Sequence, residues 1–470
     1  MWDFTKYKNK IALIEDNGIE LTYNDLVRDV KDLSNYIGDR CLCFILCENS
    51  IGSILGYVAC IQNRIVPLML NSNIDDELLL KLLEMYKPEY VYSPISRDLP
   101  TFTVFENKEY YGYRLHKTRF YKEYPLYDEL ALLLTTSGST GSPKFVRQSY
   151  KNIESNTKSI VEYLHLDENE RPITSLPMNY TYGLSVINSH LMVGATICVT
   201  DKTFMQKEFW NFVKEQKVTS IAGVPYNYEI LDKLRFTRMD LPNLKTMTQA
   251  GGKLPIELHK KFAEYAKESN KKFIVMYGQC EATARMSYLP HERALDKIGS
   301  MGIAIPGGKF HLKDVNGSYI NEPNKEGELV YEGDNVTLGY AESGDDLIKG
   351  DERNGFLETG DIAKFDKDGY YYITGRKKRF LKVFGNRVNL DELERLIKGH
   401  FNIELAIGGV DDKVTVFVLN DDKNNEIKKF IEETTKLNHT AFNFKIIDSI
   451  PHNDSGKVLY NELNKLLLWD

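Results

Sequence analysis

The stretch Leu130–Ser149 reads LALLLTTSGSTGSPKFVRQS. Its apolar start, Leu130–Leu134, has the length of a strand and is followed by Gly, Ser, Thr and Pro residues up to Lys144. Gly138 and Gly141 allow positive φ and add no bulk, so the loop exposes many backbone N–H groups. With the hydroxyls and the lysine, these donors favour polyphosphate binding over the alternative, a flexible Ser/Gly linker. The Walker A pattern GxxxxGK[ST] is not met, because here the lysine follows proline.

The segment TTSGSTGSPK resembles the ATP-binding loop of the adenylate-forming superfamily. This superfamily includes acyl- and aryl-CoA synthetases, the adenylation domains of nonribosomal peptide synthetases, and luciferases. The resemblance implies an enzyme that uses ATP to activate a carboxylic acid. It assigns the nucleotide phosphates to Thr136, Ser137, Gly138, Ser139, Thr140, Gly141 and Lys144.

The composition, with 42% hydrophobic and 27% charged residues, is typical of a soluble globular protein. A chain of 470 residues is too long for one hydrophobic core, so two or more domains are expected. The net charge of −7 argues against nucleic acid as a partner, because no basic excess is available to neutralise phosphates. The six cysteines show no CxxC spacing and lie mostly among apolar residues, which indicates free thiols in a reducing compartment.

No segment is expected to enter a membrane. The N-terminal residues MWDFTKYKNK lack the apolar core of a signal peptide. The most apolar long window, Ile51–Leu70, is interrupted by Gln62, Asn63 and Arg64, so it predicts a buried helix followed by a strand. The protein is therefore expected to be cytoplasmic.

Residues 1–129 alternate helical and strand patterns, which is typical of an α/β fold with a parallel sheet. Residues 101–125 differ, because they are rich in Tyr, Lys and Glu, and they are expected to form an irregular surface connection. The apolar spacing predicts helices at Leu21–Ile37, Ser50–Gln62 and Asp75–Tyr86, and strands at Cys41–Leu46, Ile65–Leu70 and Tyr90–Tyr92.

A strand at Phe273–Ala282 ends in YGQCE, which is similar to the YGxTE motif of the superfamily. The resemblance implies that Tyr277 stacks on adenine and that Glu281 is a catalytic carboxylate that holds Mg²⁺. Cys280 departs from the pattern, because the superfamily usually has a threonine that donates to the α-phosphate, and a thiol is a poor donor. The other nucleotide-binding residues of the motif are Gly278 and Gln279.

A turn with two adjacent glycines, Gly251 and Gly252, follows a predicted strand at Leu244–Thr248. Adjacent glycines let a flat ring lie against the backbone. In the superfamily the corresponding turn borders the adenine, so both glycines are assigned to the nucleotide site. Without that resemblance, an ordinary strand-to-helix turn would be the default interpretation.

The segment Pro177–Leu184, PMNYTYGL, lies where the superfamily lines its acid pocket. Relatives that activate α-amino acids carry an Asp where this chain has Tyr180, and a phenol cannot pair with an ammonium group. An α-amino acid held in the usual manner is therefore not expected. The alternative is a turn that packs two aromatic rings on the core. The residues assigned to the pocket are Tyr180, Tyr182, Gly223 and Tyr226.

The middle of the chain is expected to be β-rich, and Gly327–Tyr340 alternates as a strand hairpin does. The following Leu357–Asp361, LETGD, resembles the TGD motif of the superfamily. This resemblance implies that Asp361 accepts hydrogen bonds from both ribose hydroxyls. An Asp after Gly is otherwise usually a turn residue.

The basic segment Gly375–Val388, GRKKRFLKVFGNRV, resembles the superfamily's boundary between a large and a small domain. The resemblance implies that Arg376 reaches the ribose, that Lys378 is the hinge, and that Lys382 enters the site for the second half-reaction. The six cations between Arg376 and Arg387 would suit the phosphates of CoA or an acidic carrier protein. The alternative is a solvated basic hairpin.

Near the C-terminus, Asp454–Lys457, DSGK, resembles the superfamily's catalytic lysine motif, although a Gly-Lys pair alone would usually be a surface turn. The resemblance implies that Lys457 brings the carboxylate and the α-phosphate together. The implied fold has a large N-terminal domain of α/β layers with a β-rich subdomain, residues 1–374. A small mobile α+β domain, residues 375–470, follows and carries this lysine.

Five motifs in the order of the superfamily imply a two-step reaction. A carboxylate attacks the α-phosphate of Mg·ATP to give an acyl-adenylate and pyrophosphate, and a thiol then displaces AMP. The implied cofactors are ATP and Mg²⁺, and the implied partners are a small carboxylic acid and either CoA or the phosphopantetheine of an acyl carrier protein. Two alternatives stay open: a stand-alone amino-acid-activating carrier-protein ligase, and an inactive nucleotide-binding regulatory protein.

Overall fold

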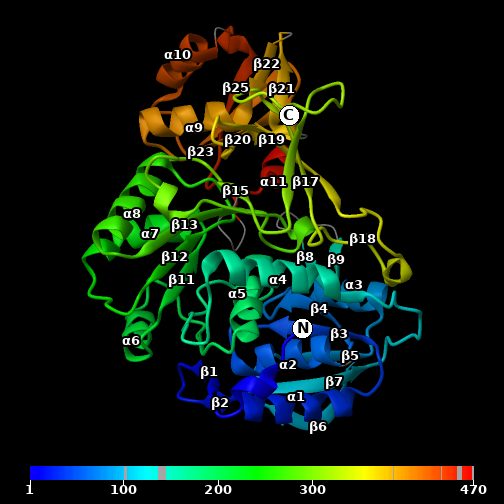
Figure 1. Cartoon of the computed structure of the whole chain (residues 1–470). Helices are drawn as coiled ribbons and strands as arrows, with labels where there is room; N and C mark the ends of the chain where they lie inside the picture. The colour runs from blue at the N-terminus through cyan, green and yellow to red at the C-terminus, as the bar shows by residue number, and fades with distance from the viewer. Residues whose placement is uncertain (100–102, 136–143, 385, 436, 453–457, 468–470) are drawn as a thin grey trace. The chain divides into compact units, whose positions relative to one another are not determined.

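The computed structural model of the chain contains two compact units (Figure 1). The first consists of Met1–Lys309 and Tyr331–Leu357, and the second of Phe310–Val330 and Glu358–Asp470. The predicted domain boundary after residue 374 concerns the part that moves during the reaction, and it stays a prediction. The structure describes residues 1–99, 103–135, 144–384, 386–435, 437–452 and 458–467.

Within the described residues, the first unit is built from two main sheets, a small third sheet and the helices that cover them. The larger sheet contains, in spatial order, β18 (Gly339–Ala341), β9 (Phe145–Ser149), β8 (Leu130–Thr135), β4 (Val66–Asn71), β3 (Leu42–Cys47), β5 (Tyr90–Pro94), β7 (Tyr113–Thr118) and β6 (Thr103–Tyr110). The second sheet contains β11 (Ser220–Gly223), β12 (Thr246–Gln249), β13 (Lys272–Tyr277), β14 (Ser287–Tyr288) and β15 (Ile303–Ala304). The small sheet contains β10 (Ile197–Val199), β1 (Ile11–Glu15) and β2 (Glu20–Thr22). The helices are α1 (Tyr23–Ile37), α2 (Ile51–Gln62), α3 (Asp76–Tyr86), α4 (Tyr150–Leu164), α5 (Thr181–Met192), α6 (Lys207–Glu215), α7 (Pro225–Lys233) and α8 (Ile256–Glu268).

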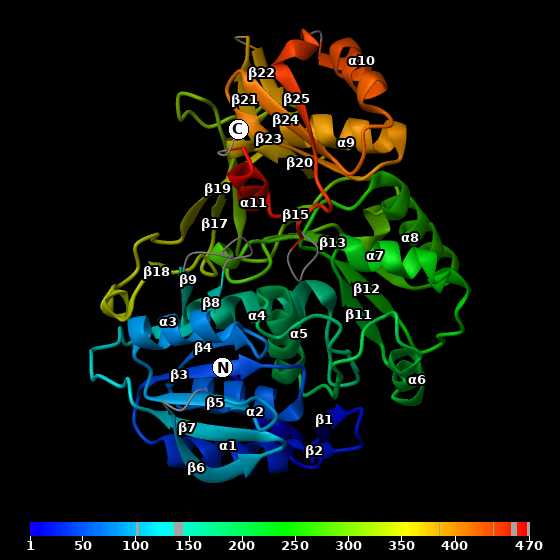
Figure 2. The same ribbon diagram turned by 180° about the vertical axis from the view of Figure 1, so that it is seen from behind.

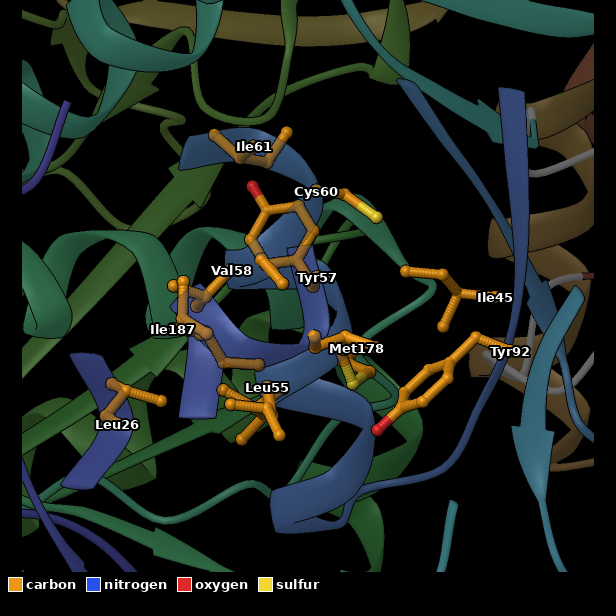
Figure 3. Close-up of a cluster of buried hydrophobic side chains, with 14 of the residues drawn as sticks. Leu26, Ile45, Leu55, Tyr57, Val58, Cys60, Ile61, Tyr92, Met178 and Ile187 are labelled. Carbon is orange, nitrogen blue, oxygen red and sulfur yellow. The ribbon is translucent and has the colours of Figure 1, made fainter. Parts of the chain in front are cut away.

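Both faces of the larger sheet are covered, because its central strands send alternate apolar side chains into opposite cores. In β3, Cys43 and Ile45 belong to the core formed with α1 and α2, whereas Phe44 and Leu46 belong to the core formed with α3. Parallel strands buried on both faces have such continuous apolar sequences. Figure 3 shows part of the first core, in which side chains of the sheet, α1, α2 and α5 gather together.

Helices α4 and α5 form a layer between the two main sheets (Figure 2). On α4, Ile153 packs in the core of the larger sheet and Ile160 in the core of the second sheet. On α5, Ile187 packs in the core of the larger sheet and Val186 in the core of the second sheet. The N-terminal end of α5, which follows Tyr180, therefore begins inside the unit rather than on its surface.

The second unit joins strands of the β-rich section to a small α/β module. Its largest sheet contains β16 (Lys309–Lys313), β17 (Gly327–Glu332), β19 (Phe356–Phe365) and β20 (Tyr371–Arg376). Two further sheets contain β21 (Phe380–Val383) and β22 (Asn386–Asn389), and β23 (Leu405–Val410), β24 (Lys413–Val418) and β25 (Phe442–Ile446). The helices are α9 (Leu390–Phe401), α10 (Asn424–Thr435) and α11 (Tyr460–Lys465). Among the described residues of the chain, no helix has the length and apolar character that a membrane span requires.

The prediction of an irregular connection at residues 101–125 is wrong. Strands β6 and β7 form an antiparallel hairpin at the edge of the larger sheet, and β7 pairs with β5. Tyr111 and Gly112 both have positive φ at the turn, as tight hairpins require. Tyr113 and Leu115 alternate into the core, but the Lys and Glu residues between the apolar positions hid this period of two.

The predicted hairpin within Gly327–Tyr340 is also wrong. Strand β17 lies between β16 and β19 in the second unit, whereas β18 pairs with β9 in the first. In this antiparallel pair, Tyr340 is opposite Val146. Both strands were therefore expected, but each pairs with a segment distant in sequence, which alternation alone does not reveal.

A buried arginine in β9 holds this pairing together. The side chain of Arg147 is fully buried, and its Nη2 forms an ion pair with Glu352 at 2.5 Å. Its guanidinium also donates to the carbonyl oxygens of Leu338, Tyr340 and two residues after the 3-10 turn η5 (Gly344–Ile348). One side chain thus fixes the segment on both sides of β18 to the edge of the sheet.

We expect Arg147→Met to destabilise the first unit by on the order of 3 kcal/mol, because buried carbonyl oxygens lose their donors. Glu352 is half-exposed and can be hydrated again, so it adds little to the loss. The matched control is Lys151→Met, which removes an exposed ion pair with Asp334 and should cost less than about 1 kcal/mol. Urea unfolding with hydrogen exchange of the β18 amides measures both variants. Equal losses would contradict the role of Arg147.

Candidate active site

Most predicted site residues lie in described parts of the chain, but in different units. The first unit contains Lys144, Tyr180, Tyr182, Gly223, Tyr226, Gly251, Gly252, Tyr277, Gly278, Gln279, Cys280 and Glu281. The second unit contains Asp361, Arg376, Lys378 and Lys382. The remaining ones, Thr136, Ser137, Gly138, Ser139, Thr140, Gly141 and Lys457, lie outside the described residues.

The predicted phosphate loop joins two neighbouring strands. Strands β8 and β9 are antiparallel, and Thr135 is opposite Phe145, so both ends of the loop are fixed by the sheet. Lys144 comes immediately before β9. Its Nζ lies 3.8 Å from the ring centroid of Tyr340 and 3.7 Å from a carboxylate oxygen of Glu342. The lysine of the loop is therefore positioned by the neighbouring strand β18.

The same tyrosine holds the predicted metal-binding carboxylate. Glu281 lies in the 3-10 turn η3 (Cys280–Ala282) after β13, and its Oε1 accepts a hydrogen bond of 2.8 Å from the Tyr340 hydroxyl. Arg353 packs on the ring at 4.7 Å and donates to the Glu281 carbonyl at 2.9 Å. Burial and the charge of Glu281 raise the pKa of Tyr340 to about 12, so the phenol stays a donor at neutral pH.

The backbone after Glu281 is strained. Thr283 has φ +65° and ψ −63°, and Ala284 N–H donates to the Ala282 carbonyl at 2.8 Å, which together define a γ-turn with positive φ. Such turns cost about 1–3 kcal/mol and persist only where the surroundings impose them. The turn folds back on Gly278, where a Cβ would lie 1.7 Å from the Ala284 carbonyl oxygen. The glycine of YGQCE is thus required by close backbone approach.

A magnesium ion fits the donors available at Glu281. Mg²⁺ is usually held by one or two carboxylates together with phosphate oxygens and water. The described residues contain no group of three or more His, Cys, Asp or Glu side chains that could hold a metal by themselves. Glu281 offers one carboxylate whose other interactions are fixed by Tyr340. When bound with ATP, the ion would offset the charge of the phosphates.

The nucleotide and acid motifs meet at Tyr180. Gly251 has φ +86°, and a Cβ at this position would lie 2.7 Å from the Tyr180 hydroxyl, so the tyrosine packs directly on the predicted adenine turn. The ring of Tyr182 makes an edge contact with Tyr180, with 6.3 Å between centroids. Its hydroxyl donates to Thr248 at 2.8 Å. Tyr226 differs from these two, because 54% of its surface is exposed.

The contacts and burial of the other residues assigned to the nucleotide and acid sites are as follows. The Tyr277 hydroxyl accepts a hydrogen bond of 3.1 Å from Gln279. Cys280 forms no disulfide and is only 5% exposed. The consequence of cysteine in place of the usual threonine therefore stays untested. Gly223 lies at the end of β11, and Gly252 packs near Pro225.

The two predicted ribose residues are neighbours in the second unit. Asp361 in β19 is directly opposite Arg376 in β20, and an ion pair of 3.6 Å joins them. Asp361 is buried, whereas Arg376 is exposed. Lys378 and Lys382 are also exposed. The pairing of a carboxylate with a cation at this edge is compatible with the predicted hydrogen bonds to ribose.

The basic segment is not one continuous cationic surface. Arg379, at the end of the 3-10 turn η6 (Lys377–Arg379), is buried and pairs with Asp391 at 2.7 Å and Glu394 at 3.1 Å. Lys377 pairs with Glu328 at 2.7 Å. Arg379 therefore stabilises the second unit itself, and Lys377 has an intramolecular partner. The sequence showed the charges but not their intramolecular partners.

Lys144 also lines an open hollow with a volume of about 390 Å³ in the first unit. Its lining is almost entirely charged, with basic and acidic side chains in equal number. It therefore lacks the apolar wall that an acid pocket needs. The lining residues are Lys144, Gly339, Tyr340, Glu342, Asp346, Lys349, Glu352 and Arg353.

The doubly covered α/β sheet, with Lys144 and Glu281 both held by Tyr340, is compatible with a nucleotide-binding enzyme. The chain belongs to the AMP-binding enzyme family, because the sequence model of that family matches residues 2–341. The predicted membership of the adenylate-forming superfamily is thereby confirmed. The prediction of an AMP-forming ligase that binds ATP is confirmed at the level of the family.

Curated relatives with assigned activities are similar over most of the chain. A 2-succinylbenzoate–CoA ligase of Bacillus licheniformis is 28% identical over 345 residues, which cover 72% of this chain and 70% of the relative. The ligase of the same description from Bacillus pumilus is 25% identical and covers 97% of this chain and 94% of its own. A feruloyl-CoA synthase of Amycolatopsis is also 25% identical, over 72% of this chain and 70% of its own.

Solved structures confirm the predicted fold class. The o-succinylbenzoate coenzyme A synthetase of Bacillus subtilis, in complex with ATP and a magnesium ion, superposes with a TM-score of 0.78 at 22% identity. The match covers 98% of this chain and 97% of that one. ATP-bound MatB of Rhodopseudomonas palustris gives a TM-score of 0.75 at 21% identity, over 98% of this chain and 96% of its own. Identities below 25% establish the fold and not the substrate.

Two residues of the site were missed in the sequence. Tyr340 belongs to a segment that predicted only a strand, and Arg353 belongs to none of the recognised motifs. Both become visible through strand pairing, because β18 is placed on β9 by contacts between distant segments. The only local signal was the Gly-Tyr pair after an alternating run, which is too common to indicate a site.

We expect Tyr340→Phe to raise the Mg²⁺ concentration needed for half-maximal pyrophosphate exchange about three- to tenfold, because Glu281 loses the donor that fixes its carboxylate. The ring and its contact with Lys144 remain, so the apparent KM for the acid should not change. The control is Tyr86→Phe, which removes a buried hydroxyl that donates to the Ala341 carbonyl at 3.0 Å. Magnesium titrations of the wild-type protein and the two variants measure this concentration. An unchanged Mg²⁺ requirement in Tyr340→Phe would show that its hydroxyl does not position Glu281.

Proposed function

We propose that this protein activates a small carboxylic acid with ATP and transfers the acyl group to a thiol. The observation that carries the proposal is the Tyr340 contact, which places the lysine of the phosphate loop and the carboxylate of Glu281 on one side chain. A cation and a metal-binding carboxylate held together in this way suit a polyphosphate with its magnesium ion.

In the first step the acid carboxylate forms a bond to the α-phosphorus of ATP, and the bond to the bridging oxygen breaks to release pyrophosphate. The carboxylate is already ionised at neutral pH, so no general base is needed. The work of the protein is positioning and charge neutralisation. Lys144 offsets charge on the phosphates, Asp361 and Arg376 hold the ribose, and Lys457 brings the two reacting groups together.

In the second step a thiol sulfur attacks the acyl carbon and AMP leaves. Lys457 cannot stay at the α-phosphate while the thiol enters, so the small domain swings about Lys378 and brings Lys382 into the site. CoA is the proposed acceptor, because the relatives reported above are described as CoA ligases and synthases. A carrier-protein phosphopantetheine is the second candidate acceptor.

The proposed acid is small, and hydroxylated, short-chain or aromatic. Tyr180 and Tyr182 provide an apolar wall with hydroxyl tips beside the adenine turn. Burial raises the pKa of both phenols well above neutral pH, so neither can be the anion that an ammonium group would need. This neutrality argues against the amino-acid-activating alternative, and the retained Lys457, Glu281 and Asp361 argue against an inactive protein.

We place the reaction in the cytoplasm. The six cysteines are buried and form no disulfide, as is usual for proteins of reducing compartments. Tight burial raises the pKa of Cys47 and Cys198, which keeps these thiols protonated and unreactive. ATP and CoA are both available in that compartment.

The decisive experiment is ATP–pyrophosphate exchange across a panel of small acids and all twenty α-amino acids. We expect exchange with small hydroxylated, short-chain or aromatic acids, and exchange at least about tenfold weaker with every amino acid, because an unpaired buried ammonium is costly. Thioester formation with CoA is then followed for the best acid. Strong exchange with a single amino acid would contradict the proposed substrate class.

A second test separates the half-reactions. Lys457→Ala should slow adenylation on the order of 10²-fold or more, because it removes electrostatic stabilisation of the transition state. Supplied with synthetic acyl-adenylate, the variant should still form thioester at nearly the normal rate. Equal losses in both half-reactions would show that Lys457 does not act specifically in the first.

A further inference from the structure

Buried arginines in the described residues differ in what balances their charge. Arg147 pairs with Glu352, and Arg379 pairs with two carboxylates of α9. Arg285 is only 3% exposed, yet it forms no ion pair with a carboxylate of any described residue. A buried guanidinium without a counterion is strongly unfavourable. Its presence therefore requires an explanation that the other two arginines do not need.

Within the described part of the chain, the groups that contact the Arg285 guanidinium are uncharged. Its Nε donates to the Ser185 hydroxyl at 3.2 Å, and its Nη1 to the Tyr163 hydroxyl at 3.0 Å and the Met276 sulfur at 3.5 Å. The ring centroid of Tyr182 lies 5.1 Å from its Cζ. No hydrogen bond joins Nη2 to a residue in the described ranges. Two N–H donors thus remain for another acceptor.

The titratable groups near Arg285 do not supply a negative charge either. Burial raises the pKa of Tyr163 and of Tyr182 above the ordinary value, so both phenols are neutral. Burial lowers the pKa of His190 to about 4, and the charge of Arg285 acts in the same direction. None of these three side chains therefore balances the guanidinium charge.

Arg285 contacts one of the residues assigned to the acid pocket. It stacks on Tyr182, which contacts Tyr180, and the Tyr180 hydroxyl lies against Gly251 of the adenine turn. Arg285 also follows Glu281 by four residues on the same segment. Successive contacts of Tyr180 and Tyr182 therefore connect the predicted adenine turn with the unpaired guanidinium of Arg285.

A small cavity of about 10 Å³ lies beside the same group. Ser185 both lines this cavity and accepts the hydrogen bond from Arg285. A polar cavity of this size can hold one water molecule. The surroundings of the guanidinium are thus not a continuous apolar core. The cavity is lined by Gln148, Asn156, Thr157, Thr181, Leu184, Ser185, Asn188, Thr283 and Ala284.

We infer that Arg285 is the counterion for a second carboxylate at the far end of the substrate, so that the protein prefers a small dicarboxylic acid. This inference rests on the proposed function. One carboxylate reacts with ATP beside Tyr180, and the other replaces the neutral acceptors of Arg285, which can bind a carboxylate through two parallel hydrogen bonds. The same charge repels an ammonium group, which agrees with the expected rejection of amino acids.

The experiment compares each diacid with its monoamide in ATP–pyrophosphate exchange. Malonate, succinate, glutarate and benzene-1,3-dicarboxylate are paired with the amides in which one carboxylate is replaced by a neutral group of the same shape. For the best pair, wild-type kcat/KM should favour the diacid about tenfold or more, because the amide leaves the guanidinium without a counterion.

Variants test whether Arg285 causes this preference. Arg285→Met should remove it, so that the diacid and its amide exchange at similar rates, and Arg285→Lys should retain part of it. The matched control is Lys158→Met on α4, which removes an exposed cation paired with Glu154 and should leave the preference unchanged. The shift of the unfolding temperature on adding ATP shows that each variant is folded.

Each contrary result has a defined meaning. If wild-type protein exchanges the amides as well as the diacids, or exchanges neither while binding ATP, the inference is wrong and the proposed function stands. If Arg285→Met lowers both members of a pair equally, Arg285 supports the tyrosines and does not select the substrate. If the protein neither binds ATP nor supports exchange with any acid, both the proposed function and this inference fail.

Discussion

The arrangement of the first unit depends on the buried guanidinium of Arg147. Strand β9 pairs on one edge with β8, which leads into the phosphate loop, and on the other edge with the three-residue strand β18. So short a strand contributes few ladder hydrogen bonds, and Arg147 adds bonds to carbonyl oxygens on both sides of it. Tyr340 is held in the middle of this strand. Arg147 therefore helps to set the position of Glu281 relative to Lys144. It does so through β18 and Tyr340, without contacting either residue.

The parts of the fold that could be predicted are those in which local sequence and global environment agree. The predicted helix α1 begins with a capping box at Thr22, and the predicted helix α2 is capped by Ser50. Strand β3 is apolar throughout because both faces are buried. The β6–β7 hairpin was missed because only alternate residues of an edge strand are apolar. The charged residues between them make the alternation hard to recognise in the sequence. Strand existence was predictable at β17 and β18, but their partners were not.

The site shows the same division. Motifs that bind through their own backbone could be recognised, since Gly278 and Gly251 meet steric demands that act over a few residues. Tyr340 and Arg353 could not, because their roles arise from contacts with Glu281 across a long sequence separation. For the basic segment Gly375–Val388, the sequence suggested a binding role for more cations than the structure leaves available. Its charges suggested one binding surface, whereas Arg379 is a buried ion-pair partner inside its own unit.

The contacts of Lys144 also suit a lysine that is held in place before the proposed phosphate ligand binds. Its ion pair with Glu342 is long, and that carboxylate is largely exposed, so the pair is weak and readily exchanged. The stacking on Tyr340 is close at 3.8 Å, and it uses the face of the ring rather than the hydroxyl. A phosphate can therefore displace Glu342 while the ring still holds the lysine. Because the hydroxyl of the same ring donates to Glu281, one side chain sets the spacing of the lysine and the carboxylate proposed to bind the metal.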